Sequence, residues 1–379
     1  MDQQIWLGKF LNKKLLYYLI ANRVVFLITI YLLAISSPTQ KILPFKSFFD
    51  FILTFAHRWD GNSYTFIASH GYITSGPEKF FIVFPPLYPL VIKFFTLFGI
   101  SPTASGFLSS NAFFVGAMLI FYKLLRLDYD KKFSYLVVVL ISIFPTSFFF
   151  SVAYPESLFV FLFISSFYFV RKKNYLLSAL AGGLAVITRP FGIVIFPALV
   201  LQLLIQRDLT AKRLLSLSLV FGMPILIYLL INYFLFGQPL IFLQFLSENW
   251  QKSFALPWDG ILSSWKRGIF TKEFSDYKFF VGYGEAIAST LAWISIPFGV
   301  KRWGIKSPYL LYLFLATILF TSTGFILSAP RYLLSIPPFF ILLAMLVNSN
   351  KLIRNVWIVL SITLLFYVSY WFAWGHWTF

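Results

Sequence analysis

The chain has 379 residues, of which 59% are hydrophobic and only 12% are charged. Soluble domains carry about 25% charged residues, so this composition excludes a water-soluble globular protein. The net charge of +18 fits loops that face an anionic membrane leaflet, and we expect no nucleic-acid partner. Because cysteine is absent, disulfides and a cysteine nucleophile are excluded as well.

Apolar runs of membrane-spanning length follow one another along the whole sequence. The first run is too long for the apolar core of a signal peptide, and no cleavage pattern follows it. The sequence predicts one all-α polytopic membrane domain, residues 1–379, with about eleven transmembrane helices of ~20 residues. They lie near 15–36, 107–126, 134–152, 156–170, 175–189, 190–206, 213–236, 283–300, 308–328, 332–347 and 355–374.

Basic residues between these runs predict the orientation of the chain. The stretch 85–99 is apolar but short for a span, and it begins with two prolines. If it lies in the membrane interface, the short basic clusters all fall on one side: Lys9, Lys13, Lys14 and Arg23; Lys123, Arg126, Lys131 and Lys132; Arg171, Lys172 and Lys173; Arg207, Lys212 and Arg213; Lys301, Arg302 and Lys306; Lys351 and Arg354. The positive-inside rule then predicts a cytoplasmic amino terminus and two long extracytoplasmic loops, at about 37–106 and about 237–282.

Asp60 is the strongest catalytic candidate in the sequence. It lies in HRWDGNSYTFIASHGY, residues 57–72, beside Arg58 and Trp59 and before Gly61. A carboxylate at the membrane surface can take a proton from an acceptor hydroxyl, with Arg58 as a neighbouring substrate contact. The alternative is a structural role for Asp60 as the cap of a helix that starts near Asn62.

Three further charges lie at outer helix junctions in apolar surroundings. Glu156 follows Tyr154-Pro155, Arg189 lies in ITRPFG, and Arg331 lies in SAPRYLL. A lone arginine at membrane depth is costly, so it is expected to face a cavity, where it can bind a lipid phosphate, or to extend to the headgroups. Glu156 borders any outer cavity, or it interacts only with the dipole of its own helix.

Aromatic residues of the two long loops complete the set of candidate substrate contacts. Trp258 in LPWDG is suited to stacking on a sugar ring or to anchoring at the interface. Tyr88 lies in FPPLYP, which is otherwise expected to form a rigid turn. No metal-binding motif, phosphate-binding loop or serine-hydrolase motif is present; we predict no metal site or cofactor, and any need for a divalent metal stays open.

The ordered set of these motifs resembles the PIG-V family of mannosyltransferases. The landmarks are RWDGNSYTFIASHGY, FIVFPPLYPLVIKFFTLFG, AYPESLFVFLF, ITRPFGIV, FGQPLIFLQF, LPWDG and SAPRYLLSIPP, which cover about 57 to 338. The wider resemblance is to the GT-C glycosyltransferase superfamily. It implies a helical bundle with interfacial helices in the first outer loop, a polyprenyl-phosphate-sugar donor, and Asp60 as the catalytic base, with Glu156, Arg189 and Arg331 as pocket candidates.

These expectations define one function and two alternatives. The predicted protein is an inverting mannosyltransferase that acts at the extracytoplasmic face on a lipid-linked or cell-surface glycan. The alternatives are a GT-C enzyme for another polyprenyl-phosphate sugar, and a lipid or solute transporter. Because no Asn-x-Ser/Thr sequon occurs, we expect a prokaryotic plasma membrane rather than an endoplasmic reticulum.

Overall fold

The computed structural model describes residues 12–36 and 45–378. Lys9 and the start of the first predicted loop, 37–44, lie outside them. The described part is built from helices, with one isolated bridge between Phe254 and Thr323. The helices are α2 (Lys13–Ile35), α3 (Phe48–His57), α4 (Asp60–His70), η1 (Pro77–Val83), α5 (Leu87–Thr96), α6 (Pro102–Leu125), α7 (Lys131–Ser142), η2 (Ser147–Ser151), α8 (Glu156–Arg171), α9 (Tyr175–Val186), η3 (Pro190–Val194), α10 (Ile195–Ile205), α11 (Ala211–Phe236), α12 (Ile241–Trp250), α13 (Pro257–Phe270), η4 (Tyr277–Gly284), α14 (Glu285–Trp303), α15 (Pro308–Thr321), α16 (Ala329–Leu334), α17 (Pro337–Asn348) and α18 (Lys351–Ala373).

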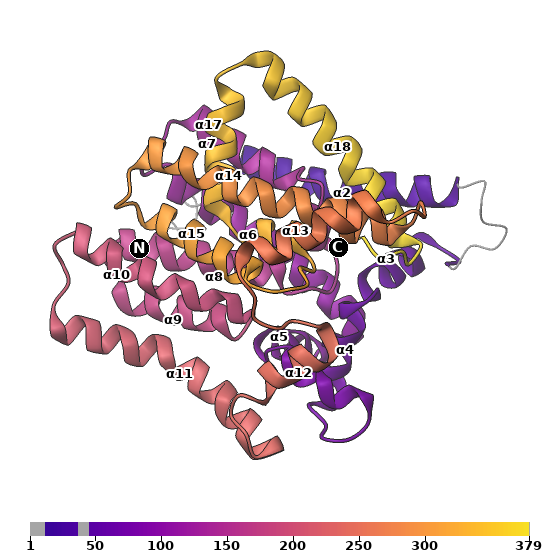
Figure 1. The fold of residues 1–379 in the computed structure, drawn as a ribbon, viewed down its shortest axis with the longest axis horizontal. Helices are drawn as coiled ribbons and strands as arrows, with labels where there is room; N and C mark the ends of the chain where they lie inside the picture. Colours follow the sequence, from indigo (N-terminus) through magenta and orange to yellow (C-terminus); the bar gives the residue numbers. More distant parts are fainter. Residues whose placement is uncertain (1–11, 37–44, 379) are drawn as a thin grey trace, which may run out of the picture.

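The helix α8 lies at the centre of the bundle, where it packs against α6 and α9. α11 and α18 lie at the periphery in Figure 1. They expose large apolar side chains, including Leu219 and Phe234 on α11 and Val359 on α18. Such surfaces are expected where helices face lipid.

All of the predicted apolar runs contain helix, but 134–152, 175–189, 190–206, 308–328 and 332–347 form helices that are shorter than the runs or divided. Within the described residues, five helices are long and apolar enough to span a membrane: α2, α6, α11, η4 with α14, and α18. The bent pair η1 and α5 would raise this number to six. The other predicted runs form shorter apolar helices, some of them divided by breaks, such as 134–152 and 332–347.

One of these breaks explains the burial of Arg23. The run 134–152 is α7, then a break that contains Pro145, then η2. The guanidinium of Arg23 donates to the carbonyl oxygens of Ser142 at 2.5 Å and Ser147 at 3.0 Å, on the two sides of the break. Arg23 is only 4% exposed, so including it in a basic cluster at the membrane surface was wrong.

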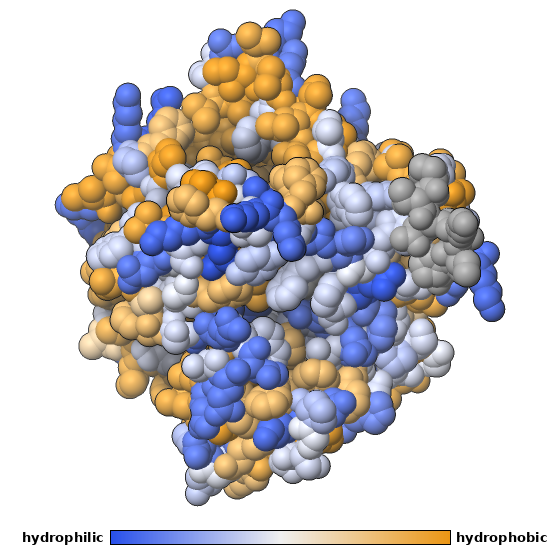
Figure 2. Space-filling model, turned by 45° about the vertical axis from the view of Figure 1, so that its right-hand side comes forward, coloured by the Kyte–Doolittle hydropathy of each residue, from blue (hydrophilic) through white to orange (hydrophobic). Residues whose placement is uncertain are grey.

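The two long loops contain helices that pack beside the bundle. α3, α4, η1 and α5 form the first loop, and α12 and α13 lie in the second. α5 has 10 residues, hence about 15 Å of the ~30 Å hydrocarbon core, and it is bent by 110° from η1. The stretch 85–99 therefore forms no straight span, and its placement in the membrane interface stays a prediction. Figure 2 brings the side of the molecule with α3 and α4 forward, and hydrophilic residues gather across the middle of this face.

The predicted orientation can be tested by introducing single cysteines into the cysteine-free chain. Ser75, in the first loop, and Ser349, between α17 and α18, are both exposed. In intact spheroplasts, an impermeant thiol reagent is expected to label Ser75→Cys and to label Ser349→Cys only after permeabilisation. The reverse pattern would contradict a cytoplasmic amino terminus.

Candidate functional site

A cavity of about 650 Å³ opens beside the start of α4. Many of its lining residues are apolar, among them Ile193 of η3, Leu229 of α11 and Leu243 of α12. We call the polar residues of the lining the polar wall. Its charged and hydrogen-bonding residues are Asp60, Thr188, Arg189, Lys252, Ser328, Arg331 and Tyr332.

Four predicted site residues form one ion-pair network at the polar wall. Arg331 donates from Nη1 to Oδ2 of Asp60 at 2.9 Å and from Nε to Oε1 of Glu156 at 2.9 Å. Arg189 donates from Nη1 to the same Oε1 at 2.9 Å and to the hydroxyl of Ser335 at 3.0 Å. The network joins α4, α8, the residue before η3, and α16, so it connects segments up to 271 residues apart.

Burial makes the pairing in this network obligatory. Glu156 is 0% exposed, and Arg189 and Arg331 are 8% and 5% exposed. A buried charge without a counter-charge is strongly destabilising, and here two arginines are balanced by two carboxylates. Aromatic rings cover the cations as well, since the guanidinium of Arg331 lies 4.7 Å from the ring centre of Tyr154.

The structure rejects the capping role for Asp60. α4 starts at Asp60 itself, and its N-cap residue is Trp59, which makes no side-chain cap. The carboxylate of Asp60 accepts from Arg331 instead. Glu156 is the first residue of α8, but its carboxylate likewise binds the two arginines. Arg189 and Arg331 are therefore not the lone charges that the sequence suggested. Asp60 and Glu156 supply the negative charge that balances Arg331.

A strained turn presents Asp60 to the cavity. Trp59 has φ 51° and ψ −120°, a conformation that is unfavourable for a bulky residue. The hydroxyl of Tyr154 donates to the carbonyl of Arg58 and accepts from the N–H of Asp60, both at 3.1 Å. Burial and the Asp60 carboxylate raise the pKa of Tyr154 well above its usual value, so the phenol keeps the proton that it donates. A Cβ on Gly61 would lie 2.4 Å from the carbonyl of Ala56, so only glycine fits behind Asp60.

Three other predicted substrate contacts lie away from the cavity. Tyr88 is fully buried, and its hydroxyl contacts Gly106 and Ser110 in α6, so it packs α5 onto α6. Trp258 is 57% exposed on α13 and does not line the cavity. Arg58 donates to the carbonyl of Ala373 at 3.0 Å and is absent from the cavity wall. These positions give no support to direct substrate binding by the three residues.

Sequence reasoning missed three residues that build the site, Lys252, Glu285 and Trp377. Lys252 donates to the hydroxyl of Tyr332 at 2.9 Å, and Trp377 lines the cavity near the carboxyl terminus. Glu285 is fully buried and accepts from the N–H of Ser328 at 2.6 Å, at the start of the helix that carries Arg331. Glu285 is an acid at the start of an apolar run, which is the same signal that identified Glu156. Lys252 and Trp377 have no comparable signal, because they lie in polar or aromatic stretches.

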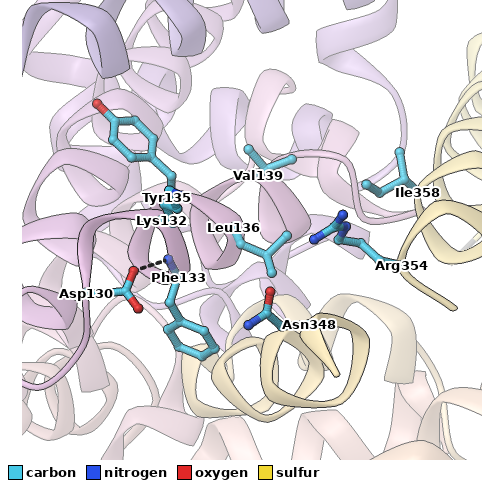
Figure 3. A pocket seen from close by; sticks show the side chains of 9 residues that line it. All are labelled: Asp130, Lys132, Phe133, Tyr135, Leu136, Val139, Asn348, Arg354 and Ile358. Carbon is cyan, nitrogen blue, oxygen red and sulfur yellow. Dashed lines mark hydrogen bonds between the residues drawn. The ribbon is translucent and has the colours of Figure 1, made fainter. Parts of the chain in front are cut away.

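A second pocket of about 500 Å³ lies between α7, α17 and α18 (Figure 3). Its acid, Asp130, accepts from the N–H of Phe133 at 2.9 Å and thereby caps α7. The other charged residues there are Lys132 and Arg354. Since Asp130 is held as a helix cap whereas Asp60 pairs with a buried arginine in the first cavity, the first cavity is the better candidate site. In the described residues, no three His, Asp or Glu side chains come together as metal ligands.

No protein-family model and no curated protein matches the chain. Among solved structures, it is similar to the crystal structure of ArnT from Cupriavidus metallidurans bound to undecaprenyl phosphate, with a TM-score of 0.51 and 12% sequence identity. The similarity covers 87% of this chain and 60% of ArnT, so the chain spans less than two thirds of the length of ArnT. This likeness shows the fold alone. The predicted GT-C-like helical bundle is confirmed, and membership of the PIG-V family stays a prediction.

The shared carboxylate of Glu156 gives a stability prediction. Glu156→Gln leaves two buried arginines with one carboxylate, so the free energy of unfolding is expected to fall by about 3–5 kcal/mol. The matched control is Asp128→Asn, which removes the half-exposed pair with Arg171 and is expected to cost about 0–1 kcal/mol. Both can be measured by titration with dodecyl sulfate in mixed micelles. Equal losses would contradict the central role of Glu156.

Proposed function

We propose that the protein is an inverting glycosyltransferase that transfers mannose from a polyprenyl-phosphate-mannose to a hydroxyl of a glycan at the extracytoplasmic face of the membrane. The observation that carries this proposal is the pairing of Asp60 with Arg331 in a cavity whose lining is otherwise largely apolar. A base for a hydroxyl, cations for a phosphate and an apolar surface for a lipid chain are thus combined in one place.

The apolar part of the lining suits the hydrocarbon chain of a lipid donor. Leu240 and Leu243 of the α12 region line the cavity and are each about half exposed, at 53% and 51%. Exposed apolar side chains at a cavity rim provide a path for an isoprenoid chain from the membrane. The bound undecaprenyl phosphate in ArnT, which shares this fold, supports a polyprenyl-phosphate donor.

Asp60 supplies the base of the proposed reaction. The acceptor hydroxyl loses its proton to the Asp60 carboxylate while its oxygen bonds to the anomeric carbon of the donor sugar. The bond between that carbon and the phosphate oxygen breaks, and its electron pair leaves with the polyprenyl phosphate. Because the phosphate is a good leaving group, the reaction needs no general acid, unlike glycoside hydrolysis. Attack opposite the leaving group inverts the anomeric configuration.

Arg189 and Lys252 are the best-placed cations for the donor phosphate. Arg331 already binds both Asp60 and Glu156, so its guanidinium is largely committed to holding the base. Arg189 and Lys252 both contact Tyr332, with Arg189 over its ring at 4.9 Å and Lys252 bound to its hydroxyl. Together they can offset the charge that grows on the departing phosphate.

The base can be tested with Asp60→Asn, which keeps the shape of the side chain but does not accept a proton at neutral pH. Loss of a general base is expected to reduce transfer about 10²–10⁴-fold. The assay is transfer of radiolabelled mannose from polyprenyl-phosphate-mannose to glycolipids extracted from cells that lack the protein. Asp50→Asn in the same loop, at a residue that does not line the cavity, is the control and is expected to keep wild-type activity. If Asp60→Asn kept more than about a tenth of wild-type activity, Asp60 would be a structural residue and not the general base.

The phosphate contact can be tested with Lys252→Ala. Loss of one charge-assisted hydrogen bond is expected to raise the KM for the donor about tenfold or more, with partial recovery in Lys252→Arg. Lys266→Ala on α13 removes an exposed lysine that does not line the cavity and should leave the donor KM unchanged. An unchanged donor KM in Lys252→Ala would assign the phosphate to Arg189 alone.

A further inference from the structure

We propose that Trp59 and Trp377 form the subsite for the acceptor sugar, and that the segment 374–378 is held over the cavity to complete it. This inference rests on the proposed glycosyl transfer and adds where the acceptor binds. Both indole rings line the cavity, and their centres lie 5.7 Å apart at an angle of 38°. Two indoles in the lining of the cavity, next to Asp60, offer flat apolar faces of the kind that pack against the C–H face of a sugar ring.

Two contacts, one from the first loop and one from the second, fix the end of α18 and the segment after it. Arg58 donates to the carbonyl of Ala373 at 3.0 Å, and Asp276 binds Nδ1 of His376 at 2.6 Å. Gly375 has φ +85°, and a Cβ there would lie 3.1 Å from Nη1 of Arg58. The chain thus turns sharply against Arg58, which brings Trp377 to Trp59. Arg58 is accordingly a positioning residue, which explains its place outside the cavity wall.

The strain at Trp59 indicates a role for its ring in function. Glycine would adopt φ 51° at little cost, yet this position carries the largest side chain, 42% exposed in the cavity lining. Backbone strain persists where the surrounding structure imposes it, as Tyr154 does here through Arg58 and Asp60. The fold alone gives no reason for tryptophan at this position.

The order of contacts across the cavity assigns the aromatic pair to the acceptor. From one side, the contacts run from Trp377 to Trp59, then through Asp60 to Arg331, and through Glu156 to Arg189. An inverting displacement requires the attacking hydroxyl and the leaving phosphate on opposite faces of the donor sugar. Since the base must touch the acceptor, the tryptophans beside Asp60 flank the acceptor, and Arg189 and Lys252 flank the donor phosphate.

The test is a kinetic separation of the two substrates. Initial rates are measured with purified protein in nanodiscs, with polyprenyl-phosphate-mannose and glycolipid extract from cells that lack the protein varied in turn. Trp377→Ala is expected to raise the half-saturating amount of extract about tenfold, while the donor KM changes less than about twofold. Trp377→Phe should recover part of the loss. Phe274→Ala, which removes an aromatic ring that is 87% exposed on the nearby loop, is the control and should resemble wild type.

Trp59→Gly separates binding from folding, because φ 51° suits glycine. This variant is expected to unfold at no lower temperature than wild type, yet to need about tenfold more extract. Wild-type dependence on the extract in both Trp377→Ala and Trp59→Gly would overturn the subsite while leaving Asp60 as the base. An equal rise in donor KM would also overturn it, since the rings would then act on the whole cavity. Failure of wild type to transfer mannose would overturn the proposed function and the subsite together.

Discussion

The carboxylate of Glu156 holds the segments around the candidate site together. It is fully buried at the first residue of the central helix α8, and its Oε1 accepts from both Arg189 and Arg331. Through Arg331 it also reaches Asp60. Because no arginine can be buried here without its counter-charge, α4, α8, α16 and the turn before η3 must come together for the bundle to close. The ion pairs that allow these segments to pack are therefore the same ion pairs that place Asp60, Arg189 and Arg331 at the polar wall of the cavity.

The site residues were visible in the sequence because they are lone charges in apolar surroundings. Such a charge must find a partner or a cavity, which singled out Asp60, Glu156, Arg189 and Arg331. Their mutual pairing was not predictable, since Asp60 and Arg331 are 271 residues apart and no local pattern connects them. The same reasoning misplaced Arg23, whose partners are backbone carbonyls at a helix break. A sequence shows that a charge needs compensation, but not whether a side chain or the backbone provides it.

The helical class was predictable from composition, and helix lengths were not. An apolar run has the same hydropathy whether it forms one spanning helix or two short ones. Hydropathy therefore did not reveal the break between α7 and η2 within 134–152. What allows such a break in an apolar interior is a donor for the freed carbonyls, and here it is supplied from α2 by Arg23. Breaks in the other runs place Arg189 and Arg331 where they meet Glu156, so the irregular backbone builds the site.

The carboxylate of Asp60 is held in a way that matches the chemistry proposed for it. Arg331 binds Oδ2, and within the described residues no hydrogen bond to Oδ1 occurs. One oxygen therefore fixes the orientation of the carboxylate, and the other is left for the acceptor hydroxyl at the cavity wall. Tyr154 fixes the backbone on both sides of Trp59 at the same time. A base positioned by its side chain and its main chain loses little entropy when the acceptor arrives, which is the contribution a rigid helical frame can make to glycosyl transfer.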